Sequence, residues 1–259
     1  MLSQQNKRWN GIPHYLIGHV SPEERYSVAR YKKEAERAIE KILSKGKTPI
    51  VVGGTGLYVN SLIYGIEYNE IPIDLEYRQK LEDIIIQHGL NFLYDKAVKI
   101  DPEAMKTISK NDKKRILRVL EIYNSTGKTK TEQEIESKKN GIKYDYKVFV
   151  ISMQRDKLYE RINKRVDNMI EQGLIQEVEN LLQKYKIFPT AMQGLGYKEV
   201  KEYIDGLITK EEMIEKIKLE TRRYAKRQLT WFKKNKEAIW LNAEDGNENN
   251  TNIILEEIY

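Results

Sequence analysis

The feature that most constrains the fold is a short apolar run that passes directly into a glycine-rich turn. Thr48–Val52 reads TPIVV, GGTG follows at Gly53–Gly56, and helical spacing resumes at Leu57. An apolar run of this length, bounded by turn residues, is typical of a buried strand. Helices are predicted on both sides of it, so residues 33–65 indicate an α/β unit with a parallel sheet.

The rest of the chain is predicted to be mainly helical. Residues 74–127 carry helical spacing throughout, with helix starts expected at Asp101-Pro102 and Asn111-Asp112. KVFVISM at Lys147–Met153 predicts a second strand. Two helices are expected after it, then a long one at about residues 210–234. The polar segment NAEDGNENNTN near the C-terminus is expected to be mobile.

Composition narrows the class of protein. The 259 residues carry a net charge of +6, a mild basic bias that is compatible with a polyanionic partner. The chain has no cysteine, which excludes disulfides and cysteine-based zinc sites. No apolar run approaches the ~20 residues of a membrane span. We therefore expect a soluble cytoplasmic protein that does not bind a membrane.

The last long helix carries an unusual mixture of charge and aromatic side chains. TRRYAKRQLTWFKKNK, residues 221–236, has seven Lys or Arg residues and no Asp or Glu. Arg223, Arg227, Trp231 and Lys234 recur at helical spacing on one face. Such a face can follow a phosphate backbone while its aromatic ring stacks on a base. The alternative is a solvated basic face with a tryptophan at the edge of the core.

Three further segments have both a functional and a purely structural interpretation. The Gly53–Gly56 turn could bind an anion through backbone N–H groups, or could only relieve backbone strain between strand and helix. Lys114, Arg115 and Arg118 lie within about one helical turn, which also fits ordinary amphipathicity. STGKT at residues 125–129 is not a Walker A loop, because Ile122 stands where that loop needs a glycine and a helix is predicted before it.

Six segments, occurring in order, resemble those of one family. They are GIPHYLI, PIVVGGTGLYVNSLIYG, NDKKRILRVLEIYNSTGKT, RVDNMIEQGLIQEV, AMQGLGYKEV and TRRYAKRQLTWFKK, and together they extend from Gly11 to about Leu241. The chain closely resembles the tRNA dimethylallyltransferases, or tRNA isopentenyltransferases. The resemblance implies a P-loop NTPase-like α/β fold, a parallel sheet flanked by helices. Residues 1–73 would form the first part of the core, 74–146 a helical insertion domain, and 147–259 the second part with C-terminal tRNA-binding helices.

The resemblance also implies an activity and its partners. The enzyme would move a dimethylallyl group from dimethylallyl diphosphate to N6 of the adenosine at position 37, beside the anticodon. Mg²⁺ would accompany the diphosphate, the RNA partner would be the tRNA anticodon stem-loop, and we expect a monomer. Thr55 and Arg222 would be catalytic, and Gly53, Gly54 and Gly56 would bind diphosphate. The tRNA-binding residues would be Thr55, Arg78, Lys114, Arg115, Ile116, Leu117, Arg118, Gln193, Gly194, Leu195, Gly196, Tyr197, Lys198, Lys226, Arg227, Gln228, Leu229, Thr230, Trp231, Phe232 and Lys233.

The sequence also departs from the family pattern. Family members begin with a strand and a G-x-T-x-x-G-K-[ST] loop that holds the diphosphate, followed by an Asp proposed as general base. Here MLSQQNKRWNG stands in place of both, and Gly18 occupies a position usually held by Asp. Two hypotheses remain open: a dimethylallyltransferase whose first segment is supplied elsewhere, and a truncated tRNA-binding chain without activity, which we expect of this chain alone. A third is prenyl transfer to free adenine nucleotides, which would need no such RNA surface.

Overall fold

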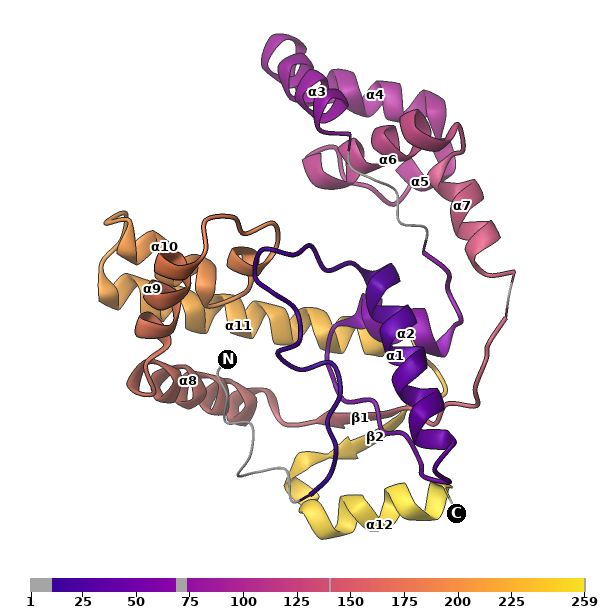
Figure 1. Cartoon of the computed structure of the whole chain (residues 1–259), viewed down its shortest axis with the longest axis vertical. Helices are drawn as coiled ribbons and strands as arrows, with labels where there is room; N and C mark the ends of the chain where they lie inside the picture. Colours follow the sequence, from indigo (N-terminus) through magenta and orange to yellow (C-terminus); the bar gives the residue numbers. More distant parts are fainter. Residues whose placement is uncertain (1–10, 69–73, 140, 259) are drawn as a thin grey trace. The chain divides into compact units, whose positions relative to one another are not determined.

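The computed structural model describes residues 11–68, 74–139 and 141–258, so MLSQQNKRWN lies outside the described residues. The chain divides into two compact units (Figure 1). Unit 1 comprises Met1–Ser27, Tyr31–Val59 and Asp145–Tyr259; unit 2 comprises Val28–Arg30 and Asn60–Tyr144. The helical insertion expected at residues 74–146 thus falls largely within unit 2, which begins earlier in the chain.

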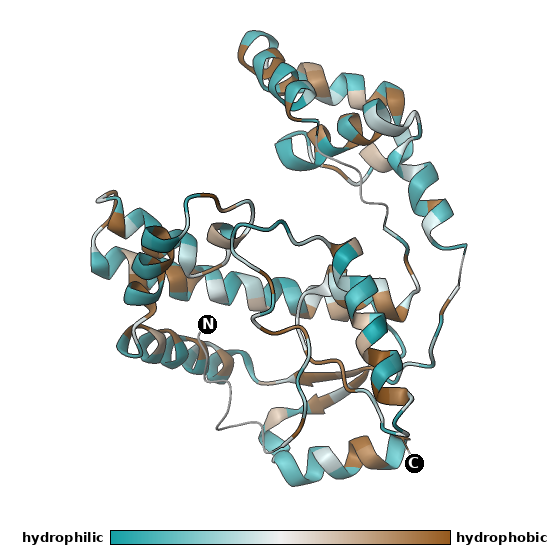
Figure 2. Cartoon of the chain, viewed as in Figure 1, coloured by the Kyte–Doolittle hydropathy of each residue, from teal (hydrophilic) through white to brown (hydrophobic). Residues whose placement is uncertain are grey.

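The secondary structure is mostly helical, with one small sheet. In chain order the elements are α1 Val28–Leu43, α2 Gly56–Ile63, α3 Leu75–His88, α4 Leu90–Ile100, α5 Pro102–Met105, α6 Lys113–Thr126, α7 Lys130–Ser137, β1 Phe149–Ser152, α8 Arg155–Glu171, α9 Leu174–Lys184, the 3-10 turn η1 Ala191–Gln193, α10 Tyr197–Ile204, α11 Lys210–Phe232, β2 Ile239–Asn242, η2 Ala243–Asp245 and α12 Asn247–Ile258. The strands β1 and β2 are parallel, with Phe149 opposite Ile239. Figure 2 shows both strands as strongly hydrophobic. An α/β fold with a small parallel sheet is therefore confirmed.

Two sequence-based expectations are wrong. Thr48–Val52 is not a strand: its residues lie in irregular structure, and Ile50 and Val52 are 80% and 89% exposed. The physical reason is that a strand needs a hydrogen-bonded neighbour, and β1 and β2 pair only with each other among the described residues. The polar C-terminal segment is ordered secondary structure, because Asn242 ends β2 and α12 begins at Asn247.

The core of unit 1 that supports α11 is formed by helices α8 to α11. Val166, Val178, Val200, Met213 and Ile217 are fully buried and pack in one cluster. Met213 and Ile217 both lie in the first half of α11, so that half is anchored to the core. Its second half, which contains the basic segment, has no fully buried residue and keeps its cations accessible.

The core of unit 2 is formed mainly by α3, α4 and α6. Leu81, Leu93 and Leu120 are among its most deeply buried side chains. Two predicted helix starts are confirmed here: Asp101 caps α5 by accepting from Ala104 N at 3.0 Å, and Asp112 caps α6 by accepting from Arg115 N at 3.1 Å. The Asp112 cap fixes where the basic end of α6 begins.

Candidate functional site

The glycine turn of unit 1 is fastened to helix α11. The Gln228 side chain donates from Nε2 to the carbonyl oxygen of Gly54 at 2.9 Å, and the Tyr224 hydroxyl lies 3.5 Å from the same oxygen. The turn leads directly into α2, whose first residue is Gly56. Two segments that are predicted to be functional, and that lie far apart in the sequence, are therefore in contact.

Helix α11 approaches two of the three glycines closely. A Cβ atom on Gly54 would lie 1.9 Å from Gln228 Nε2, and one on Gly56 would lie 2.3 Å from Cδ1 of the Trp231 ring. A Cβ on Gly53 would meet nothing within 4 Å. The sequence suggested either anion binding or relief of strain, and neither interpretation included this packing. The diphosphate-binding role of the three glycines stays a prediction.

The two residues expected to be catalytic have different neighbours. Thr55 is exposed, and its carbonyl accepts from Tyr58 N at 2.9 Å and Val59 N at 3.1 Å at the start of α2. Arg222 donates from Nη1 to Asn163 Oδ1 of α8 at 2.7 Å. No hydrogen bond or ion pair joins Thr55 to Arg222 in the part of the chain that the structure describes. Their catalytic roles stay predictions.

A pocket of ≈ 670 Å³ lies between α11 and the loop before α10. Its lining residues are Gln193, Leu195, Lys198, Glu199, Lys216, Glu220, Tyr224 and Arg227. The Arg227 guanidinium lies over the Tyr224 ring, 5.7 Å from its centroid. The structure thus brings the predicted loop at Gln193–Lys198 to the predicted basic helix, in a pocket with both cations and an aromatic ring.

The loop that lines this pocket is held by two glutamates that sequence reasoning missed. Gly196 has φ +95°, and its N–H donates to Oε2 of the buried Glu199 at 2.8 Å. The Tyr197 hydroxyl donates to Glu177 Oε1 of α9 at 2.6 Å. Burial raises the pKa of Tyr197, so this hydroxyl stays protonated and continues to donate. Glu199 lies three residues after Gly196, and this spacing is typical of a helix start. The sequence alone could therefore have indicated this contact.

The remaining predicted residues at the end of α11 differ in how exposed they are. Lys226, Arg227, Thr230, Trp231 and Lys233 are exposed, whereas Gln228, Leu229 and Phe232 are only partly so. Lys234 Nζ lies 5.8 Å from the Trp231 ring centroid. The exposed set is a row of cations beside one large ring, which is a surface that suits single-stranded nucleic acid.

A second group of predicted residues lies in unit 2, around the start of α6. Arg78 Nε of α3 lies 3.3 Å from Glu121 Oε1, and Arg118 Nη1 lies 3.8 Å from Glu121 Oε2. Arg115 pairs with Asp112 at 3.2 Å, and Lys114 is exposed. The four cationic residues of the predicted RNA surface in this unit, Arg78, Lys114, Arg115 and Arg118, therefore lie on two helices, α3 and α6.

Ile116 and Leu117, which are also predicted to bind tRNA, have buried side chains, and their tRNA-binding role stays a prediction. They are 0% and 2% exposed and belong to the hydrophobic core of unit 2. The family-like segment is continuous in sequence, but a helix turns successive residues to different sides. Ile116 and Leu117 hold α6 on the core, and the cations Lys114 and Arg115 beside them are exposed.

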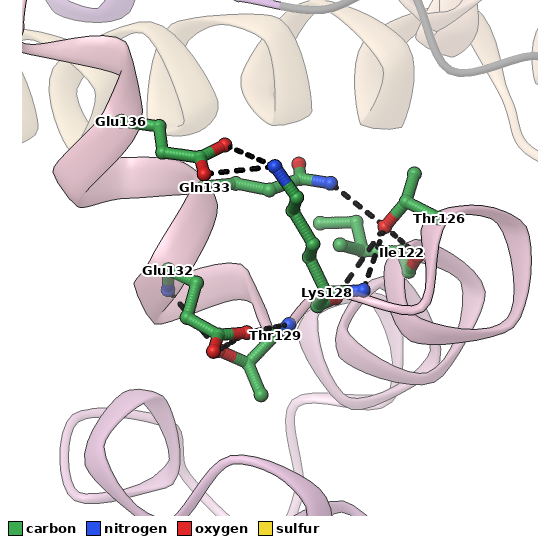
Figure 3. A network of polar contacts seen from close by, with 7 residues as sticks. All are labelled: Ile122, Thr126, Lys128, Thr129, Glu132, Gln133 and Glu136. Atoms are coloured by element: carbon green, nitrogen blue, oxygen red, sulfur yellow. Dashed lines mark hydrogen bonds and ion pairs between the residues drawn. The ribbon is translucent and has the colours of Figure 1, made fainter.

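The STGKT segment joins two helices, as the sequence argument required. Ser125 and Thr126 end α6, Gly127 is its left-handed C-cap at φ 67°, and Thr129 is the N-cap of α7. Figure 3 shows its polar contacts: Lys128 Nζ lies 2.8 Å from both carboxylate oxygens of Glu136, and Gln133 Nε2 donates to Thr126 Oγ1 at 3.0 Å. The helix predicted before this segment, where a Walker A loop needs a strand, is confirmed as α6.

Two broader features concern membranes and metals. None of the helices in the described part of the chain combines the length and the apolar composition that a bilayer crossing requires. The described residues also contain no group of three or more His, Asp or Glu side chains that could together hold a metal ion.

The chain is similar to known transferases in both its sequence and its structure. The family model described as IPP transferase matches residues 3–235. The tRNA dimethylallyltransferase of Acetivibrio thermocellus is 48% identical over 236 residues, which cover 91% of this chain and 75% of that relative. The solved tRNA isopentenylpyrophosphate transferase of Bacillus halodurans has a TM-score of 0.65 at 38% identity, covering 96% of this chain and 77% of its own. The solved structure of a eukaryotic dimethylallyltransferase acting on tRNA has a TM-score of 0.67 at 32% identity. The match covers 90% of this chain and 60% of that chain.

Proposed function

The chain belongs to the IPP transferase family, and on that premise we propose that it transfers a dimethylallyl group from dimethylallyl diphosphate to tRNA. The acceptor we propose is N6 of the adenosine at position 37, in the anticodon stem-loop. The observation that carries the proposal is helix α11, which contacts the glycine turn through Gln228 and lines the pocket through Tyr224 and Arg227.

The chemistry of the acceptor explains why such a surface is needed. An exocyclic amine of adenine is not accessible inside a stacked anticodon loop, so the base must turn out into a pocket. A volume of ≈ 670 Å³ lies within the range that pockets for small organic groups occupy. We assign Arg227, Lys226 and Lys233 to the phosphates, and Tyr224 and Trp231 to stacking on bases.

The chemistry of the donor asks for positive charge and positioned donors. The allylic carbon becomes cationic as diphosphate leaves, so catalysis depends on stabilising the leaving group and accepting the N6 proton. In this proposal the Thr55 hydroxyl and the Arg222 guanidinium act at that centre, and the N–H groups of Gly53, Gly54 and Gly56 face the diphosphate. Mg²⁺ would enter with the diphosphate, which supplies oxygen ligands of its own.

A second candidate function, tRNA binding without transfer, is favoured by one observation. The side chains that contact the turn among the described residues, Tyr224, Gln228 and Trp231, are all neutral. A diphosphate at this turn would therefore lack the cation that phosphate sites normally supply.

One experiment separates the two functions. Purified chain is incubated with Mg²⁺, dimethylallyl diphosphate and unmodified tRNA, and the digested tRNA is analysed by mass spectrometry. Binding of the same tRNA is measured in parallel. Dimethylallylated adenosine at position 37 supports transfer, whereas binding without product supports the second candidate. A chain that shows neither binding nor product contradicts both.

A further inference from the structure

Glu121 is a buried carboxylate that lies between two arginines of unit 2. It belongs to α6 and is 5% exposed, with Leu117 and Leu120 of the core close by in sequence. Its two oxygens contact different helices: Oε1 lies 3.3 Å from Arg78 Nε of α3, and Oε2 lies 3.8 Å from Arg118 Nη1 of α6. One carboxylate thus contacts two guanidiniums from two helices.

The negative charge of the buried Glu121 carboxylate is compensated by the two arginines. A buried carboxylate is costly unless it is paired. Oε1 is buried without a hydrogen bond among the described residues, so the ion pairs carry its charge compensation. Burial, followed by the negative charges of Glu121 and Asp74, raises the pKa of the neighbouring Tyr77. The pairs therefore restrain Arg78 and Arg118.

Both arginines nevertheless keep part of their surface accessible. Their side chains are 37% and 40% exposed, against 6% for Glu121. A guanidinium has five N–H donors, so a single contact to Glu121 leaves several free for a further acceptor. The carboxylate is on the interior side, and the free donors are on the solvent side.

We propose that Glu121 is a positioning residue that holds Arg78 and Arg118 as a pair of guanidiniums for phosphate groups of the RNA. This inference rests on the proposed function. Long flexible side chains lose conformational entropy when they bind, and a restraint in the free protein lowers that loss. Planar guanidiniums also fit phosphate oxygens in a fixed geometry, which a mobile side chain does not offer. Glu121 thus favours RNA whose phosphates match the spacing of the pair.

The test compares two substitutions that change the charge equally. Glu121→Gln removes the central charge with little change of shape. Glu82→Gln is the matched control, because Glu82 of α3 pairs with Lys113 of α6 and so joins the same two helices at a more exposed position. Dissociation constants are measured on the full chain for an anticodon stem-loop and for an unrelated hairpin of equal length, over a series of salt concentrations.

The expected result is a change in selectivity rather than a general loss of binding. Glu121→Gln should lower the preference for the anticodon stem-loop by about five- to tenfold, the effect of losing roughly one well-positioned hydrogen bond to a phosphate that matches the pair. Binding of the unrelated hairpin should stay equal or tighten, because a competing negative charge is gone. Glu82→Gln should leave the preference unchanged. A purely structural role would instead lower thermal stability and leave the preference of the folded protein intact.

Three outcomes overturn the inference. The first is an unchanged preference in Glu121→Gln, and the second is an equal loss in Glu82→Gln. If Glu121→Gln does not fold, Arg78→Lys keeps the positive charge and removes the planar fork; an unchanged preference in that variant is the third. An unsubstituted chain without any preference contradicts the proposed function itself, so the two failures are distinguishable.

Discussion

The contact between the glycine turn and α11 predicts a different cost of substitution at each of the three glycines in that turn. In Gly56→Ala the new Cβ would lie 2.3, 2.4 and 2.6 Å from Cδ1, Nε1 and Cε2 of Trp231. An indole ring is rigid, so the whole ring or the backbone must move. In Gly54→Ala the clash is with the flexible amide end of Gln228, and Gly53→Ala meets nothing within 4 Å.

The magnitudes follow from these contacts. Overpacking of a fitted site costs about 1–3 kcal/mol, and better helix propensity returns up to ~1 kcal/mol for Ala at the start of α2, so Gly56→Ala should lose roughly 1–2 kcal/mol of unfolding free energy. Gly54→Ala should lose about 1 kcal/mol through the displaced Gln228 hydrogen bond. Gly53→Ala should be neutral or gain up to ~1 kcal/mol, because alanine restricts the unfolded chain.

The assay uses urea unfolding together with the fluorescence of Trp231. The chain contains three tryptophans, so Trp9 and Trp240 are replaced by Phe to isolate the signal of Trp231. Gly56→Ala should shift the Trp231 emission and weaken tRNA binding, while Gly53→Ala should do neither. Trp231→Leu should remove most of the cost of Gly56→Ala in a double-mutant cycle. Equal behaviour of Gly53→Ala and Gly56→Ala, or no coupling to Trp231, would refute the packing argument.

Three further predictions concern RNA binding, transfer and pH. Arg223→Ala and Arg227→Ala should each weaken tRNA binding. Each should also reduce the slope of log affinity against log salt concentration by up to about one, because one phosphate contact is lost. An unchanged slope in filter binding for both variants would count against this face of α11. Thr55→Ala should cut the transfer measured with the unsubstituted protein by roughly one to three orders of magnitude with little change in thermal stability, since Thr55 is exposed. A large loss of stability with normal activity per folded molecule would instead show that Thr55 only supports the conformation of the turn. Burial by itself raises the pKa of Asp101, but hydrogen bonds from Thr131 and Ala104 and the charge of Lys130 outweigh it, so the pKa is lowered overall. The stabilisation by Asp101 should therefore be present above the ordinary Asp pKa of about 3.9 and be lost as pH falls through the lower folded value. Asp101→Asn should remove roughly 1–3 kcal/mol from unit 2 at neutral pH, seen as faster hydrogen exchange in α5 and α7, and Thr131→Val should cost less because the Thr131 N–H still donates. Equal exchange at pH 7 in Asp101→Asn and the unsubstituted chain would contradict this account.

Local chemistry was enough to predict several features of this protein. The caps at Asp101 and Asp112 depend on hydrogen bonds to N–H groups two or three residues away, so sequence spacing reveals them. Strand β1 was predicted because its apolar residues are contiguous, and the cations of α11 were predicted because their spacing is helical. The rejection of STGKT as a phosphate loop also depended only on neighbouring residues.

Other features depend on partners that are distant in sequence. Thr48–Val52 has the composition of a strand, yet only a neighbouring strand could supply its hydrogen bonds, and among the described residues none does. The need for glycine at positions 54 and 56 comes from Gln228 and Trp231, far along the chain. Arg78 and Arg118 meet at Glu121 because α3 packs on α6, and the same packing buries Ile116. Periodicity can be read from one segment, whereas steric fit and charge compensation involve two, and only the tertiary structure brings the two together.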